Sequence, residues 1–270
     1  MPITAVDDPG DPRLVELTGL TDAEARAAME DEHGCFVAEG LLTLEAALRS
    51  AYPVRSVLVA ERRLARVRQL LADEGAGDVD VFVGPQPLLE GVTGFRIHRG
   101  VVASVGRLAL PDPEALVAGA RRVLVIEAVN DHENLGALFR NAAAFGVDAV
   151  LLDPRCADPL YRRSVRVSLG HVLHVPWTRT TALADALPAL SGTGITTLAL
   201  TPWGEVTVHE VVRRRSGGDR LAWVVGAEGP GLDQATLDAA DERVRIPIRE
   251  GVDSLNVATA AAVALAIGWR

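Results

Sequence analysis

The sequence predicts an α/β protein in which a small α/β domain precedes a larger domain with a mostly parallel, doubly wound sheet. Short apolar segments alternate with helical patterns from Arg121 onward, and this alternation is typical of doubly wound domains. The segments are apolar throughout, as in parallel strands that helices cover on both faces. Pro111 and Pro113 disfavour regular structure and mark a break. We expect an N-terminal extension and small domain at residues 1–108, a linker at 109–120 and the larger domain at 121–270.

The first domain reads as helices and strands in turn. A short acidic helix opens it, and Glu39–Ala51 has the apolar spacing of an amphipathic helix. Runs rich in valine, bounded by charged or turn-forming residues, predict the strands. We expect helices at Asp22–Asp31, Glu39–Ala51, Glu61–Glu74 and Pro87–Thr93, and strands at Val54–Ala60, Asp80–Val83 and Val101–Val105.

The second domain contains six predicted strands with helices between them. The strands are expected at Val123–Glu127, Ala149–Leu152, Val172–Val175, Thr196–Leu200, Ala222–Gly226 and Val244–Ile248. The helices are expected at Leu135–Phe145, Leu160–Ser168, Ala182–Leu190, Gln234–Ala240 and Ser254–Gly268. Ligands of such sheets bind beyond the carboxyl ends of the strands. The loops after Leu200, Gly226 and Ile248 are therefore the first places to look for a site.

Charge alone does not decide whether the partner is a nucleic acid. The net charge of −9 argues against one at first, because affinity for phosphates comes from cations. Binding depends on a local patch, however, and not on the sum. All 27 basic residues are arginine, which suits phosphate contacts and stacking on bases. Solvated helix faces explain the same arginines, so composition neither supports nor excludes RNA.

Other global features indicate a cytoplasmic protein without a structural metal. No apolar run reaches the roughly 18 residues of a membrane span. The first ten residues lack the basic and apolar regions of a signal peptide. Cys35 and Cys156 are too few for a disulfide scaffold and too far apart for a CxxC pair.

The first candidate segment runs from Asn134 to Ala142 and opens a helix after the strand that ends at Glu127. Asn134 is a possible N-cap of that helix. Arg140 lies on the same helix, whose Leu135 and Leu138 are predicted to be buried. Taken alone, the segment indicates a helix with one surface arginine.

The second candidate segment is a glycine-rich turn at Gly226-Ala-Glu228-Gly-Pro-Gly231, directly after a strand. Glycines let a backbone approach a ligand closely. The segment is neither GxGxxG nor a P-loop. By itself it is as well explained by a tight turn before a helix as by a ligand loop.

The third candidate segment joins the polar loop after Ile246 to an apolar helix through Ser254-Leu255-Asn256-Val257. Ser254 is a plausible N-cap. Asn256 is expected inside the first turn of a helix that looks buried all round. A buried amide without hydrogen bonds costs roughly 1–3 kcal/mol, so Asn256 is expected to have partners.

Together and in this order, the three segments resemble the motifs of the SpoU family, within the SPOUT superfamily of RNA methyltransferases. The motifs are Asn134-x-Gly136-x-x-x-Arg140, Gly226-x-Glu228-Gly-x-Gly231 and Ser254-Leu-Asn256-Val257, and the resemblance spans Val123 to Trp269. Arg249-Glu250 and Ala258-Thr259 depart from the family pattern. Neither departure removes a residue that the family uses for chemistry.

The resemblance implies a knotted SPOUT methyltransferase domain that binds S-adenosylmethionine in its C-terminal loops, and a homodimer. It implies transfer of a methyl group to a ribose 2′-hydroxyl of RNA, ribosomal RNA more than transfer RNA. Catalytic roles are implied for Arg140, Asn134, Glu228, Ser254 and Asn256. Donor contacts are implied for Leu200, Thr201, Gly226, Glu228, Gly231, Ile246, Leu255 and Asn256.

Arg140 is the central residue in the chemistry that the resemblance implies. The family is sometimes described as using this arginine as the base. A guanidinium has a pKa above about 12, so a safer role is to clamp the RNA phosphate and stabilise the developing oxyanion. The other motif residues would then order the loops and orient Arg140.

The first domain resembles the small substrate-binding domain of many family members. The resemblance rests on Phe36-Val37-x-Glu39-Gly40 and Ile97-His98-Arg99-Gly100-Val101. It suggests an RNA platform, for which a solvated surface is an equally good explanation. The candidate arginines are Arg62, Arg63, Arg66, Arg96 and Arg99.

The sequence leaves two alternatives open and disfavours a third. The chain could modify transfer RNA. It could be a non-catalytic RNA-binding or ribosome-assembly factor on the same scaffold, which donor binding would distinguish. A dinucleotide-dependent oxidoreductase is disfavoured, because GxGxxG is absent after the first strand of the second domain.

Overall fold

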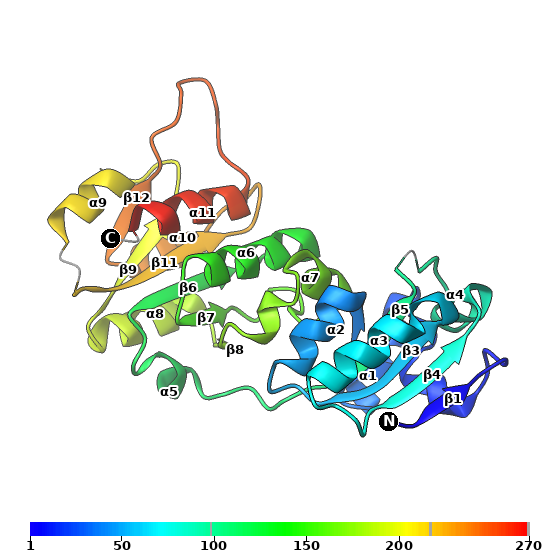
Figure 1. The fold of residues 1–270 in the computed structure, drawn as a ribbon. Coiled ribbons are helices and arrows are strands. Elements are labelled where there is room, and N and C mark those ends of the chain that lie inside the picture. The colour runs from blue at the N-terminus through cyan, green and yellow to red at the C-terminus, as the bar shows by residue number, and fades with distance from the viewer. Residues whose placement is uncertain (98, 216–217, 269–270) are drawn as a thin grey trace. The chain divides into compact units, whose positions relative to one another are not determined.

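The computed structural model describes residues 1–97, 99–215 and 218–268. The chain divides into two compact units (Figure 1). The first comprises residues 1–109 and 160–174, and the second comprises residues 110–159 and 175–270. The predicted domains differ from these units in two places. Residues 160–174 pack with the first unit, and residues 110–120, expected as a linker, belong to the second unit and contain the short helix Pro113–Val117.

The first unit is built on a mixed five-stranded sheet with the order β1-β4-β3-β5-β2. Its strands are β1 (Ile3–Ala5), β2 (Cys35–Glu39), β3 (Val54–Ala60), β4 (Asp80–Gly84) and β5 (Val101–Gly106). Its helices are η1 (Pro12–Leu17), α1 (Ala23–Glu32), α2 (Leu41–Leu48), α3 (Glu61–Asp73), α4 (Gln86–Thr93), α7 (Arg162–Val167) and η2 (His171–Leu173). Strands β1, β4 and β3 are parallel, whereas β5 is antiparallel to β3 and β2.

The helix expected at Glu39–Ala51 begins only at Leu41. Glu39 instead ends the buried strand β2, which pairs with β5. Gly40 then adopts φ 101°, a backbone conformation that favours glycine. The sequence did not predict this strand, because a charged residue such as Glu39 is not expected in a buried strand. In the structure the carboxylate of Glu39 is nevertheless buried. Arg166 Nη1 at 3.3 Å and Arg162 Nη1 at 3.6 Å pair with it.

The strand expected at Val172–Val175 is wrong. Residues His171–Leu173 form the short 3-10 helix η2, and the strand of this region is β8 (Trp177–Arg179). Val172 is buried because η2 packs against α2 in the first unit and does not join a sheet. An apolar run signals burial but not which unit provides it.

The second unit contains a seven-stranded sheet with the order β10-β12-β9-β11-β6-β7-β8. Its strands are β6 (Arg122–Glu127), β7 (Ala149–Leu152), β8, β9 (Ile195–Leu200), β10 (Val206–Thr207), β11 (Arg220–Gly226) and β12 (Glu242–Arg245). All neighbouring pairs are parallel. Strand β12 ends earlier than expected, before Pro247, which has no N–H to donate to a sheet.

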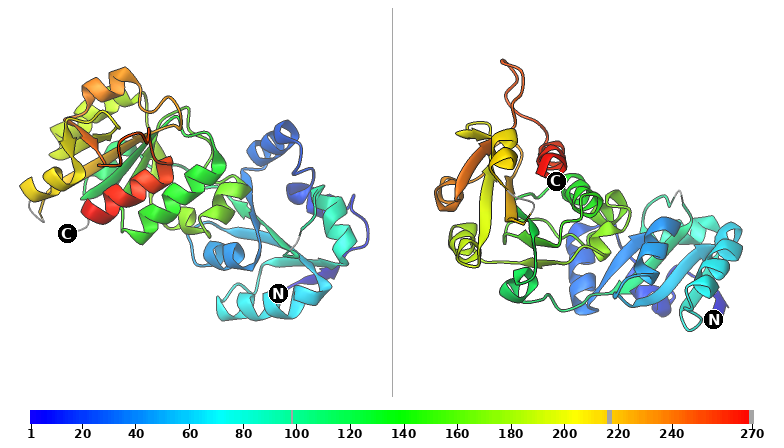
Figure 2. Two further views of the ribbon diagram at one scale, coloured as in Figure 1. Left: turned by 90° about the horizontal axis from the view of Figure 1, so that it is seen from above. Right: turned by 60° about the vertical axis from the view of Figure 1, so that its left-hand side comes forward.

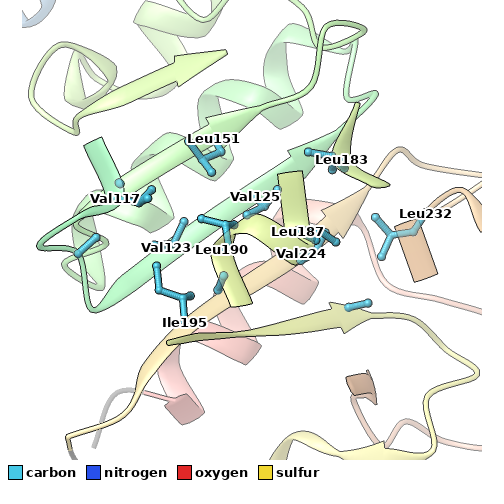
Figure 3. Close-up of a cluster of buried hydrophobic side chains, with 14 residues drawn as sticks. Val117, Val123, Val125, Leu151, Leu183, Leu187, Leu190, Ile195, Val224 and Leu232 are labelled. Atoms are coloured by element: carbon cyan, nitrogen blue, oxygen red, sulfur yellow. The ribbon is translucent and has the colours of Figure 1, made fainter. Parts of the chain in front are cut away.

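Helices cover both faces of this sheet. They are α5 (Pro113–Val117), α6 (His132–Ala144), α8 (Leu183–Gly192), α9 (Val208–Arg214), α10 (Gln234–Ala239) and α11 (Val257–Gly268). Figure 3 shows the core on one face, where Leu183, Leu187 and Leu190 of α8 pack on Val123 and Val125 of β6. Helices α6 and α11 lie side by side (Figures 1 and 2). Parallel strands buried on both faces explain why the strand segments are apolar throughout.

Helix α11 is also tied to α6 by a polar contact. The side-chain amide of Asn141 donates to the carbonyl oxygen of Ala258 at 2.7 Å. This bond fixes the start of α11 against α6. In the part of the chain that the structure describes, no helix is long and apolar enough to span a membrane.

Candidate functional site

The second unit has a cavity of about 680 Å³ at the carboxyl ends of β9, β11 and β12. Its walls are the loops at residues 200–203, 225–232 and 246–257. The predicted donor contacts that line it are Leu200, Thr201, Gly226, Glu228, Gly231, Ile246, Leu255 and Asn256; Ser254 lines it as well. A cavity of this size suits a small-molecule ligand, and the parallel sheet explains its place.

The glycine loop after β11 closes back on its own start. The N–H of Gly231 donates to the carbonyl oxygen of Ala227 at 3.0 Å. A Cβ atom on Gly226 would overlap the backbone of Gly231 and Leu232. Gly229 and Gly231 adopt φ 86° and 74°. The sequence needs glycine here because the chain passes close to itself and turns through left-handed conformations.

Asn256 connects the three motif segments. Its side-chain nitrogen donates to Asn134 Oδ1 at 2.8 Å and to Glu228 Oε1 at 2.5 Å. Its Oδ1 accepts the backbone N–H groups of Ala258 at 3.0 Å and Thr259 at 3.1 Å. Asn256 is therefore the N-cap of α11. One side chain starts the helix and joins segments that lie far apart in the sequence.

Two expectations about this helix were wrong. Ser254 is not its cap, and its side chain makes no hydrogen bond with the residues that the structure describes. Asn256 is exposed and precedes the first turn, whereas burial inside that turn was expected. The helix begins three residues later than predicted, because the polar loop extends to Asn256. The expectation that Asn256 has hydrogen-bond partners is confirmed.

The sequence suggested Asn134 as the N-cap of α6, but the N-cap is Asp131. The carboxylate of Asp131 accepts the backbone N–H groups of Glu133 at 2.9 Å and Asn134 at 2.8 Å. Asn134 lies within the first turn, so its side chain is available to Asn256. Asn134 does not itself line the cavity.

Arg140 lies apart from the cavity. It is exposed on α6 and does not line the cavity. Its guanidinium forms no hydrogen bond or ion pair with any residue that the structure describes. Within one chain, the motif residues therefore separate into a group at the cavity and an unpaired cation on the surface of α6.

A buried carboxylate holds the start of α10, directly after the glycine loop. Glu127, at the end of β6, accepts the backbone N–H of Asp233 at 2.8 Å and the hydroxyl of Thr236 at 2.5 Å. Burial raises the pKa of Glu127, while these hydrogen bonds oppose the rise. Arg155 pairs with Glu127 at 3.2 Å. Sequence reasoning missed this role, although a single glutamate at the end of an apolar strand was a signal.

Sequence reasoning also missed Trp203. This residue lines the cavity and is 87% exposed. The available signal was a tryptophan three residues beyond the end of β9, in one of the loops that the parallel-sheet rule selects. Pro202, Val252 and Asp253 also line the cavity; they lie in the C-terminal loops that were expected to hold the donor, although they were not named as single contacts.

The arginines predicted for an RNA platform belong to the first unit, and all five are exposed. Arg62, Arg63 and Arg66 lie on α3. The loop before β5 approaches the start of this helix, because the N–H of Ala60 donates to the carbonyl oxygen of Gly100 at 2.9 Å. Arg99 therefore lies near the start of α3. His98, part of the predicted motif, lies outside the described residues.

Comparison with known proteins identifies the family. The model of the SpoU rRNA Methylase family matches residues 121–266. An uncharacterized tRNA/rRNA methyltransferase of Mycobacterium tuberculosis is 44% identical over 259 residues, which are 96% of this chain and 89% of that protein. This relative thus spans both units.

Solved structures share the fold. The SpoU methyltransferase AviRb from Streptomyces viridochromogenes, in complex with the cofactor AdoMet, matches with a TM-score of 0.80 and 22% identity, covering 96% of this chain and 97% of that chain. A structure described as an RNA 2′-O ribose methyltransferase matches with a TM-score of 0.75 and 25% identity, covering 98% of both chains. With the family match and the relative that spans both units, the likeness leads to one conclusion: the chain belongs to the SpoU rRNA methylase family of RNA methyltransferases.

Proposed function

We propose that this chain transfers a methyl group from S-adenosylmethionine to a ribose 2′-hydroxyl of RNA, and that the RNA is ribosomal. The observation that carries the proposal is the hydrogen-bonded cluster of Asn134, Glu228 and Asn256, of which Glu228 and Asn256 line the cavity. The structure described as a 2′-O ribose methyltransferase, with 25% identity over nearly the whole of both chains, supports the choice of the ribose hydroxyl.

The cavity fits S-adenosylmethionine. Its volume lies within the range of small-molecule sites. The glycine loop leaves backbone groups bare at the wall, since a side chain at Gly226 would not fit. Glu228 and Asp253 also line the cavity, and acidic residues suit a ligand that carries positive charge. When bound, this donor supplies a methyl group attached to a positively charged sulfur.

The residues of the chain then have to position the ribose and stabilise the charge on its oxygen. Attack by the hydroxyl requires the oxygen to lie about 3–3.5 Å from the methyl carbon. We assign to Arg140 the clamp on the neighbouring phosphate and the stabilisation of the developing oxyanion. An exposed guanidinium without a partner in the described chain is free for this task.

We further propose that the active form is a homodimer. Arg140 lies outside the cavity of its own chain, so a second chain is needed to complete the site. Helix α11 consists almost entirely of alanine, valine, leucine and isoleucine, and Ala262, Val263 and Ile267 on it stay partly exposed. Covering this surface with a second copy would bury apolar area beside α6.

The test uses ribosomal RNA and transfer RNA as separate substrates with methyl-labelled S-adenosylmethionine. Methylation of the 2′-oxygen removes the nucleophile of alkaline cleavage, so the label should survive in alkali-resistant dinucleotides from ribosomal RNA. Label released in mononucleotides would place the methyl group on a base and contradict the proposal. Label on transfer RNA alone would correct the substrate. Donor binding without transfer to either RNA would favour a non-catalytic factor.

A further inference from the structure

The exposed apolar side chains of the cavity lie at its rim. Val225, Leu232 and Val257 are at most 9% exposed and form its floor. The large apolar residues of the rim are Trp203 at 87% exposed, Val252 at 49%, Ile248 at 38% and Leu255 at 36%. The indole of Trp203 is thus the largest and most exposed apolar group at the mouth of the cavity.

The backbone that carries this indole is fixed. The N–H of Thr201 donates to the carbonyl oxygen of Val244 at 2.9 Å, and the N–H of Gly204 donates to that of Thr201 at 3.2 Å. A Cβ atom on Gly204 would overlap the backbone of Val244 and Arg245. Arg245 Nη1 also donates to the carbonyl oxygen of Gly204 at 2.7 Å. The turn is held against β12 while the indole stands in solvent.

An indole in water has free energy to gain from a partner. Trp177 and Trp223 are only 6% and 3% exposed, so the fold buries tryptophan elsewhere. Aromatic rings carry a large apolar area, and burying it is favourable. A flat partner covers a ring best, and unpaired bases of RNA stack on such side chains. A fixed backbone lowers the cost of ordering the contact.

The position of Trp203 distinguishes a base of the RNA from the adenine of the methyl donor. The volume of the cavity is large enough for a small donor, whereas Trp203, at 87% exposed, is not one of its buried walls. An RNA strand is too large to enter and has to present its ribose at the mouth, where Trp203 lies. We propose that Trp203 stacks on a base of the substrate RNA, at or beside the nucleotide that is methylated. This inference rests on the proposed function.

The test compares Trp203→Ala and Trp203→Phe with the full-length protein. The probes are a single-stranded oligoadenylate of about ten nucleotides, a phosphodiester strand of the same length without bases, and S-adenosylhomocysteine. Leu42→Ala serves as control, because Leu42 is 53% exposed in the first unit. The alanine variant should bind oligoadenylate about tenfold or more weakly, and phenylalanine should restore part of the affinity. Binding of the abasic strand and of S-adenosylhomocysteine should not change.

Fluorescence gives a second readout. Oligoadenylate should quench the tryptophan emission of the wild-type protein, and the quenching should shrink in Trp203→Phe, which identifies its source. Equal losses for oligoadenylate and the abasic strand would overturn the stacking proposal. So would weaker binding of S-adenosylhomocysteine, which would assign Trp203 to the donor, or dissociation of a dimer, which would assign it to a subunit contact. Failure of the wild-type protein to bind S-adenosylhomocysteine would instead contradict the proposed function, while stacking on oligoadenylate would remain measurable.

Discussion

The side-chain nitrogen of Asn256 donates a hydrogen bond to Asn134 Oδ1 at 2.8 Å, across 122 positions of the chain. The same nitrogen reaches Glu228, and the oxygen of the same amide caps α11. The start of the C-terminal helix and the arrangement of the cavity loops therefore depend on one amide group. The amide nitrogen holds the cavity loops and the amide oxygen caps the helix, so substitutions of Asn256 can test the two roles separately.

Asn256→Asp and Asn256→Ala should have different effects. Aspartate keeps an oxygen for the N-cap but places a second carboxylate against Glu228, so methyl transfer should fall strongly while thermal stability changes little. Alanine removes both functions and should also cost about 1 kcal/mol of stability through the lost cap. Initial rates and thermal unfolding of both variants provide the measurement. Wild-type activity in Asn256→Asp would contradict this account.

Arg140→Ala should abolish transfer without unfolding the protein. The side chain is exposed and has no partner among the described residues, so its loss removes no contact that supports the fold. Loss of a group that stabilises transition-state charge lowers the rate by about 100-fold or more. Binding of S-adenosylhomocysteine should be retained, as calorimetry can establish. Arg140→Lys is the matched variant, and it should recover part of the rate if charge matters more than the guanidinium shape.

Gly226→Ala should remove donor binding. The added Cβ would overlap backbone atoms of Gly231 and Leu232, which cannot move away as a flexible side chain would. Gly119→Ala is the control in the same unit, because a Cβ there meets nothing within 4 Å. We expect the control to bind S-adenosylhomocysteine normally in calorimetry. Normal binding by Gly226→Ala would show that the loop is not packed as described.

Arg63→Glu should weaken RNA binding and lower its dependence on salt. Each lost phosphate contact reduces the slope of log affinity against log salt by about one. Arg213→Glu makes the same change of charge on α9 of the second unit, where Arg213 is also exposed. Titrations at several salt concentrations should show a smaller slope for Arg63→Glu than for the control. Identical slopes would mean that the arginines of α3 form a solvated surface.

Asp153 should make the fold sensitive to acid. Burial by itself raises the pKa of this carboxyl, but hydrogen bonds from the Ala128 N–H and from Arg155 outweigh it, so the pKa lies below its ordinary value of 3.8. A lowered folded-state pKa stabilises the fold above the unfolded value, and this stability is lost as pH falls through the folded value. Asp153→Asn should therefore be less stable near neutral pH and lose less between about pH 5 and 2. Denaturant unfolding across this range measures both effects.

The sequence predicted the positions of most strands because strand burial leaves a direct mark on composition. Val54–Ala60 and Ala149–Leu152 were predicted with the bounds that the structure shows. Patterns could not reveal that a glutamate would sit inside β2, since its charge is neutralised by arginines from a distant segment. They also could not place Val172 with the first unit, because periodicity carries no information about which residues pack together.

For the site, the motifs identified residues that line one cavity but not the way they are joined. The bond from Asn256 to Asn134 spans most of the second unit, and no local spacing encodes it. Capping was misjudged at both helices because several residues near each start could act as caps. The distance of Arg140 from its own cavity follows from the course of α6, which the motif pattern does not describe. Trp203 was missed because an isolated aromatic residue in a loop belongs to no periodic pattern or motif.

The excursion of the chain at residues 160–174 into the first unit affects how the protein is made. Glu39 meets its arginine partners, and Ala46 its neighbour Gly170, only after these later residues exist. During synthesis on the ribosome, the first unit therefore cannot complete its packing until the chain has been made as far as His174. For the same reason, dividing the chain near residue 110 would produce two incomplete fragments. The N-terminal fragment would bury Glu39 without its arginine partners, and the C-terminal fragment would carry the apolar residues of 160–174 without the unit that they pack against.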